Sequence, residues 1–197
     1  MYEVTDFGDL AVLVPLSVAI LLWLVAVRCS QAIVPWCASL ALCLGGTASL
    51  KIYFFACPVG SDLVNPSGHT SFSTLIYGAL AVVVAAQLTG TWQRIAAIGV
   101  GAALPAMIAL SRLAIRAHSL VEIILGIGLG LASLALFTRA YLRCRPAYNR
   151  LSILVVPVII IMIMIHGRQL GGEEFLHTLG RYLPLRSFAC GCAELLP

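Results

Sequence analysis

Residues 10–27 read LAVLVPLSVAILLWLVAV and contain no charged side chain. An apolar run of about 20 residues is long enough to cross the hydrocarbon core of a bilayer as a helix. Five further runs of this kind follow along the chain. The six predicted spans are about 10–27, 33–55, 71–89, 95–111, 121–141 and 151–166. The pattern therefore predicts an all-α, polytopic membrane protein, a bundle of about six transmembrane helices.

The composition also indicates that lipid surrounds the chain. Of its 197 residues, 61% are hydrophobic and only 10% are charged, whereas a soluble domain carries about 25% charged residues. So few charges cannot cover a water-facing surface, and we expect the lipid bilayer in its place. No basic run with interleaved aromatic residues occurs, which argues against nucleic acid as a partner. The composition leaves the oligomeric state open.

The six runs also define the domain organisation. Residues 1–166 form the predicted membrane domain, and residues 167–197 form a more polar C-terminal tail on the same side as the site. The N-terminus is acidic rather than basic, so we expect the first run to be retained as a span and not cleaved as a signal peptide.

The chain has seven cysteines, an odd number. Cys29, Cys37 and Cys43 lie in or beside apolar runs. We interpret these three as small buried hydrophobic residues rather than as redox groups. The tail contains Cys190 and Cys192, whose role the sequence leaves open.

The arginines predict the orientation of the chain. The connectors between spans one and two, three and four, and five and six share one side of the membrane and carry no acidic residue. Their arginines are Arg28, Arg94, Arg139, Arg143, Arg145 and Arg150. The positive-inside rule places this side in the cytoplasm. In a bacterial inner membrane, both termini, the 56–70 loop and the 112–120 connector would then face the periplasm.

Ionisable residues near membrane depth are candidates for a functional site. In this chain the informative ones are Lys51, His69, Arg112, Arg116, His118 and Glu122. All six fall on the same predicted side, although 71 residues separate the first from the last. Independent contacts with lipid headgroups would be scattered over both sides. We therefore predict that the six residues converge on one site at the outer membrane interface.

The segment Asn65-Pro66-Ser67-Gly68-His69 is typical of a helix start. Asn is a good N-cap and Pro suits the first helical position. The amides of Ser67 and Gly68 would then face an anion. An ordinary capped turn explains the same residues equally well.

The segment from Ser111 to Glu122 contains a histidine and an acid in a suggestive spacing. If His118 starts the fifth span, Glu122 lies one turn later on the same helix face. A carboxylate there can fix the tautomer of the imidazole, as in an activated nucleophile held by an orienting group. Alternatively, Glu122 only complements the helix dipole, and His118 lies at the level of the lipid headgroups.

Together these residues resemble the type 2 phosphatidic acid phosphatases, also called the lipid phosphate phosphatases. Residues 66–69 match the second family motif, Pro-Ser-Gly-His, in full. Ser111, Arg112 and His118 match the third motif, with Glu122 at its Asp position. In the first motif Lys51 is present, but Cys57-Pro58 stands one residue early in place of Arg-Pro. One phosphate-binding arginine is therefore missing.

The resemblance implies a metal-independent phosphatase that needs no cofactor. His118 would be the nucleophile that forms a phosphohistidine, His69 the acid and base, and Glu122 the residue that orients His118. Arg116 is predicted to replace the missing arginine, because it shares a face with Arg112 if the helix continues. The predicted phosphate-binding residues are thus Lys51, Ser67, Gly68, Ser111, Arg112 and Arg116.

The predicted substrate is a membrane lipid phosphate, such as undecaprenyl diphosphate, phosphatidylglycerol phosphate or phosphatidic acid. Two alternatives remain at this point. One is a phosphotransferase of the same fold that passes the phosphoryl group to a second lipid. The other is a non-catalytic lipid-binding or transport protein whose site has decayed, for which the missing arginine is the support.

Overall fold

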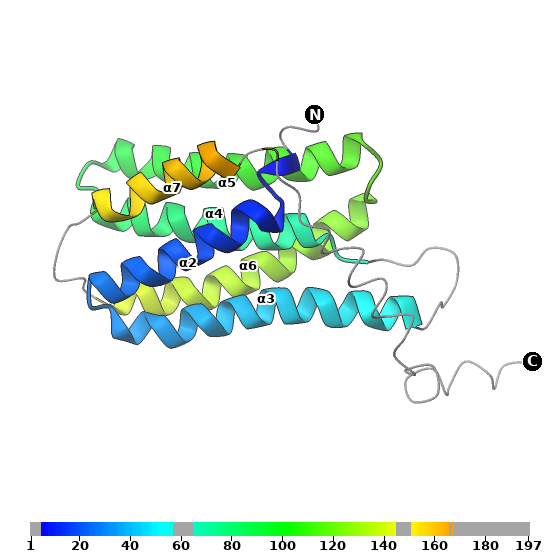
Figure 1. Ribbon diagram of the computed structural model, residues 1–197, viewed down its shortest axis with the longest axis horizontal. Coiled ribbons are helices and arrows are strands. Elements are labelled where there is room, and N and C mark those ends of the chain that lie inside the picture. The colour runs from blue at the N-terminus through cyan, green and yellow to red at the C-terminus, as the bar shows by residue number, and fades with distance from the viewer. Residues whose placement is uncertain (1–4, 57–64, 145–150, 166, 168–197) are drawn as a thin grey trace, which may run out of the picture.

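The computed structural model describes residues 5–56, 65–144, 151–165 and 167, and these residues form a helical membrane bundle with no strand (Figure 1). The helices are α2 (Leu10–Ala26), α3 (Ser30–Ala56), α4 (Gly68–Gln87), α5 (Thr91–Ala114), α6 (Leu120–Arg143) and α7 (Leu151–Ile165). Each coincides with one predicted span, which confirms the predicted architecture. Four of them, α3 to α6, are long and apolar enough to cross a membrane, while α2 and α7 are shorter apolar helices. Apart from Gly167, the predicted tail lies outside the described residues.

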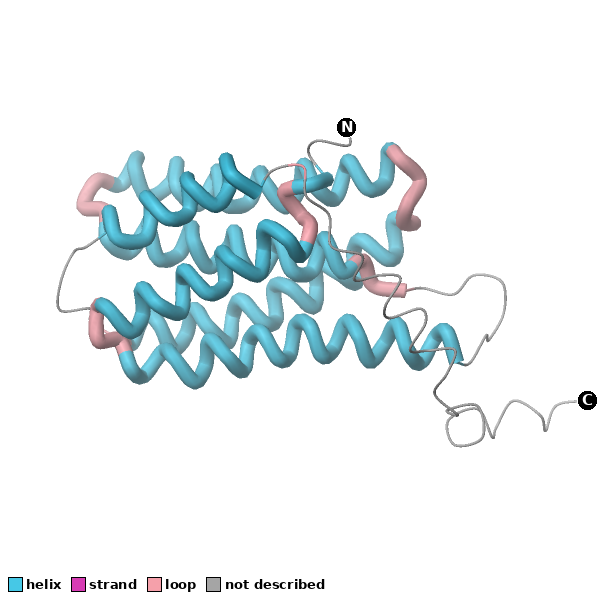
Figure 2. The backbone as a smooth tube through the Cα atoms, viewed as in Figure 1, coloured by secondary structure: helices cyan, strands magenta, loops and turns pink. Residues whose placement is uncertain are grey.

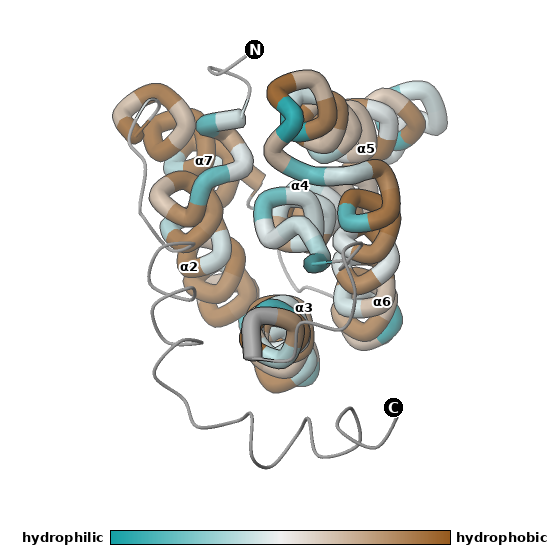
Figure 3. Tube along the Cα trace, turned by 90° about the vertical axis from the view of Figure 1, so that its right-hand side faces the viewer, coloured by the Kyte–Doolittle hydropathy of each residue, from teal (hydrophilic) through white to brown (hydrophobic). Residues whose placement is uncertain are grey.

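Helix α4 occupies the centre of the bundle and contacts α2, α3, α5 and α6 (Figure 3). Within its most apolar window 67% of the residues are buried, against 22–28% for α3, α5 and α6. The first two turns of α4 nevertheless contain buried hydroxyl residues, and Thr74 Oγ1 donates to the Thr70 carbonyl oxygen at 2.7 Å. Such local bonds satisfy the hydroxyl groups inside the bundle. The start of α4 is therefore both polar and enclosed.

Two glycines of α6 allow it to pack closely against α4. A Cβ atom added at Gly126 would lie 2.8 Å from the Ser67 carbonyl oxygen, and one at Gly130 would lie 2.6 Å from the Ser71 carbonyl oxygen. Small residues at this spacing let the backbones of membrane helices approach each other. The contact brings the beginning of α6 next to the beginning of α4.

The turns between helices alternate between the two ends of the bundle (Figure 2). The α2–α3 turn, with Arg28, and the α4–α5 turn lie at one end. The α5–α6 turn lies at the other end, together with the start of α4. This alternation agrees with the predicted order of spans. Arg145 and Arg150 lie outside the described residues, and the side that faces the cytoplasm stays a prediction.

The interpretation of the cysteines holds in full for one of the three and in part for a second. Cys43 is buried as predicted, but Cys37 is exposed on α3. Cys29 follows α2 and is joined by a disulfide to Cys144, which follows α6, with a Cα–Cα distance of 5.9 Å. Cys29 is buried as predicted, but its disulfide was missed because the partner lies 115 residues away in the sequence.

Candidate active site

The predicted site residues come from helix ends that meet at one end of the bundle. His69 lies in the first turn of α4, Arg112 in the last turn of α5 and Glu122 in the first turn of α6. Figure 3 looks onto this end, where the paler, more polar start of α4 lies among largely hydrophobic helices. A polar site is thus held at the end of an apolar bundle.

Glu122 contacts His118 directly. Its Oε2 atom lies 3.2 Å from His118 Nδ1 and accepts a hydrogen bond from the Ser119 amide at 2.7 Å. Ser119 is the N-cap of α6, and its side chain accepts from the Glu122 amide, which completes a capping box. The sequence had suggested that His118 starts the helix, but His118 in fact precedes it. The two interpretations of Glu122 combine, because one carboxylate both caps the helix and holds the imidazole.

Glu122 also ties α6 to the segment before α4. Its Oε1 atom accepts a hydrogen bond from the Asn65 amide at 3.1 Å. Its backbone carbonyl accepts one from the Ser67 amide, also at 3.1 Å. The second and third motifs are therefore joined through a single residue.

These bonds correct the prediction for the helix start. The N-cap of α4 is Ser67 rather than Asn65, and the helix begins at Gly68. The Ser67 amide is bonded to Glu122 and does not face an anion. The buried Oγ atom of Ser67 accepts from the amide and the hydroxyl of Thr70 at 3.4 and 3.0 Å. The Gly68 amide is the better candidate to face an anion, because it lies in the first turn, where helical N–H groups lack an intrahelical acceptor.

Two predicted phosphate-binding cations are buried at this end. Lys51, on α3, is only 5% exposed, and its Nζ atom lies 4.0 Å from the position that a Cβ would take on Gly68. Arg112 is 9% exposed. Its carbonyl accepts a hydrogen bond from the Ala117 amide at 3.0 Å, which fixes the turn that leads to His118. Cations beside a helix N-terminus suit an anionic group such as phosphate.

The structure does not form the helix face that Arg116 was predicted to share with Arg112. Helix α5 ends at Ala114, and Arg116 follows the cap with a φ of 55° and an exposed side chain. Residues in this left-handed conformation commonly end helices. The premise of a continuing helix was wrong, and phosphate binding by Arg116 stays a prediction.

The N-terminal segment supplies two contacts that the sequence did not indicate. Thr5 Oγ1 lies 2.8 Å from Ser111 Oγ, which itself donates to the Ile108 carbonyl at 2.7 Å. Ser111 is thereby committed to contacts within the protein. Asp9 Oδ2 lies 3.7 Å from His69 Nε2. In the sequence, the position of Asp9 just before the first apolar run indicates a helix cap and nothing more.

Comparison with known proteins gives two matches. Residues 51–146 match the PAP2 superfamily, and this segment begins at Lys51 and includes both histidines and Glu122. Over 139 residues the chain is 32% identical to an uncharacterized 22.5 kDa protein in the cps region of Klebsiella pneumoniae. That alignment covers 68% of this chain and 66% of the relative. No solved structure matches significantly.

Proposed function

Because the chain belongs to the PAP2 superfamily, we propose that it is a membrane-embedded phosphatase acting on a lipid phosphate or diphosphate. The observation that carries the proposal is the pair of His118 and Glu122, whose Nδ1 and Oε2 atoms lie 3.2 Å apart at the polar end of the bundle. The reaction would take place at the outer face of the bacterial inner membrane.

The contact with Glu122 supports a nucleophilic His118. A carboxylate at Nδ1 favours the tautomer with the proton on that nitrogen, which leaves the lone pair on Nε2. We infer that Nε2 attacks phosphorus. A P–N bond forms, and the bond from phosphorus to the oxygen of the lipid alcohol or lipid monophosphate breaks. His69 gives a proton to that departing oxygen.

Hydrolysis of the phosphohistidine completes the reaction. His69 takes a proton from a water molecule, whose oxygen attacks phosphorus while the P–N bond breaks. Inorganic phosphate leaves and His118 is restored. Lys51, Arg112 and the Gly68 amide hold the phosphoryl oxygens, where fixed donors stabilise the charge that develops in the transition state.

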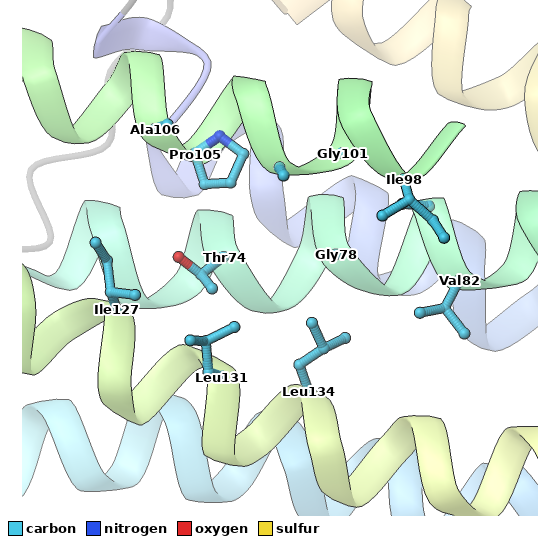
Figure 4. A pocket seen from close by; sticks show the side chains of 12 residues that line it. Thr74, Gly78, Val82, Ile98, Gly101, Pro105, Ala106, Ile127, Leu131 and Leu134 are labelled. Atoms are coloured by element: carbon cyan, nitrogen blue, oxygen red, sulfur yellow. The ribbon is translucent and has the colours of Figure 1, made fainter. Parts of the chain in front are cut away.

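A cavity beside the site supports a lipid as the substrate. It has a volume of about 400 Å³ and lies between α4, α5 and α6 (Figure 4). Thr74, at its nearer end, lies seven residues after Ser67, or about 10 Å along α4. From there the lining is almost entirely apolar, and it extends to Val82 and Ile98. We infer that a hydrocarbon chain of the substrate lies here while its phosphate reaches His118.

Phosphate release from the purified protein in lipid nanodiscs tests the proposal. We expect release from at least one of undecaprenyl diphosphate, phosphatidylglycerol phosphate and phosphatidic acid. The rate should survive EDTA and fall with orthovanadate, which mimics the five-coordinate transition state. His118→Ala should abolish turnover. A His118→Ala protein that keeps more than about a tenth of the activity would show that the nucleophile is another group.

A further inference from the structure

The N-terminal segment, residues 5–9, is docked onto the site end of the bundle. Tyr77 on α4 donates a hydrogen bond from its hydroxyl to the Phe7 carbonyl at 2.7 Å. Thr5 bonds Ser111 on α5. A Cβ atom added at Gly8 would lie 2.7 Å from a methyl carbon of Ile108 and 3.5 Å from His69 Cβ. The segment is therefore packed against α4 and α5, with Gly8 next to His69.

Asp9 ends this segment and is itself buried. Its Oδ1 atom accepts a hydrogen bond from the Ala11 amide at 2.8 Å, as the N-cap of α2. Its Oδ2 atom points to His69 Nε2, at 3.7 Å. Glu122 is arranged in the same way, with bonds to a helix N-terminus and a contact to an imidazole. Both histidines thus lie beside a carboxylate that a helix start holds in place.

We propose that Asp9 is the positioning residue of His69, a role that rests on the proposed phosphatase function. Since Nε2 of His69 faces Asp9, proton transfer would run through Nδ1. That nitrogen gives its proton to the departing oxygen and later takes one from water. The carboxylate holds the ring in this orientation. It also balances the imidazolium charge that His69 carries before the first step and regains in the second, as the aspartate of a catalytic triad does for its histidine. The distance between the two atoms is 3.7 Å, and catalytic contacts are often this long until the substrate binds.

Four proteins test the proposal: the wild type, Asp9→Asn, His69→Gln and the double variant. Asn is as good an N-cap as Asp, so Asp9→Asn removes the charge and keeps the start of α2. We expect His69→Gln to lower kcat/KM about a hundredfold or more, and Asp9→Asn about tenfold or more. The double variant should be as slow as His69→Gln within about twofold, because residues that act as a unit do not have additive effects. Thermal unfolding should show little change for Asp9→Asn.

Tyr77→Phe is the matched control, because it removes the bond to Phe7 without touching either member of the pair. Any fold-loss in kcat/KM that Tyr77→Phe causes should multiply with the fold-loss caused by His69→Gln when the two changes are combined. The proposal would be overturned if Asp9→Asn kept the wild-type kcat/KM. It would also be overturned if the fold-loss in kcat/KM of Asp9→Asn multiplied with that of His69→Gln in the double variant. In either case Asp9 would be a helix cap only. A wild-type protein that releases no phosphate from any of the three lipids would instead refute the phosphatase function itself.

Discussion

Arg112 and Arg116 differ in surroundings although only four residues separate them. Arg112 is buried in the last turn of α5, whereas Arg116 is exposed beyond the helix. Removing one fixed donor from a site that stabilises developing charge costs about a hundredfold or more in rate. We expect this loss in kcat/KM for Arg112→Ala. For Arg116→Ala we expect less than about tenfold, since an exposed guanidinium is already hydrated.

Steady-state kinetics on both variants, with Arg116→Lys beside them, check this expectation. An equal loss at the two positions would place Arg116 in the phosphate site, in agreement with the sequence-based prediction. A wild-type rate for Arg112→Ala would contradict the assignment of Arg112 to phosphate binding.

Contacts within one turn of chain were predictable, and contacts between distant segments were not. His118 and Glu122 are four residues apart, so their spacing alone indicates a meeting. Asp9 and His69 meet only because α2 packs beside α4, and no local pattern encodes that. The end of α5 was missed for another reason. An arginine adopts the left-handed conformation that glycine usually supplies, and no glycine marks the position in the sequence.

At the scale of elements, the contact between α6 and α4 sets the distance between the two motifs. In Gly126→Ala the new methyl group would meet the Ser67 carbonyl at 2.8 Å, and a backbone atom cannot rotate away. We expect α6 to shift, with a loss of about 1–3 kcal/mol in stability and of most activity, because Glu122 bonds Asn65 and Ser67 across this contact. Thermal unfolding and phosphate release measure the two effects.

Gly128 on the same helix is the matched control, with open space around its added Cβ. Gly128→Ala should keep full activity and gain stability of about 0.5–1 kcal/mol, because alanine loses less backbone entropy in a helix. Equal stability and equal activity of the two variants would mean that the close approach of α6 to α4 does not determine the geometry of the site.

The cavity between α4, α5 and α6 gives a second prediction for these helices. Ala102 lines it, whereas Ala103, the next residue on α5, lies outside the lining although it is equally exposed. A phenyl ring at position 102 would fill space that we assign to the hydrocarbon chain. We expect Ala102→Phe to raise KM for a long-chain lipid phosphate about tenfold, the effect of losing about 1.4 kcal/mol of binding. A short-chain phosphate should be unaffected, and Ala103→Phe should match the wild type on both. Equal KM values for the two variants on the long-chain substrate would exclude the cavity as its site.

For the whole molecule, hydrophobicity predicted the helices well because a bilayer permits few alternatives. Each span must satisfy its own backbone, so an apolar run of sufficient length becomes a helix. The order of packing was not predictable in this way. Helix α4 is central because it carries small hydroxyl residues and meets Gly126 and Gly130, and hydrophobicity alone does not rank one span above another.

The predicted orientation of the molecule and its disulfide lead to opposite expectations for the compartment that the arginine-rich end faces. Cys29 and Cys144 lie at the end of the bundle with Arg28, Arg139 and Arg143, which the positive-inside rule assigns to the cytoplasm. Disulfides are rare in that compartment, where thiols are kept reduced. We therefore expect the two sulfurs to be reduced in growing cells and to join only after oxidation. Alkylation in intact cells before lysis, followed by mass spectrometry, measures the fraction joined.

A second measurement fixes the orientation independently. In a cysteine-free background, a single cysteine is placed either at Ala117, exposed beside the site, or at Thr89, exposed in the α4–α5 turn at the other end. A membrane-impermeant maleimide should label position 117 in intact spheroplasts, and position 89 only after permeabilisation. The reverse labelling, together with a disulfide already formed in cells, would mean that the arginine-rich end faces the oxidising compartment. The site would then open to the cytoplasm and take its lipid phosphates from the inner leaflet, because a phosphate group crosses the hydrocarbon core only at a high cost in free energy.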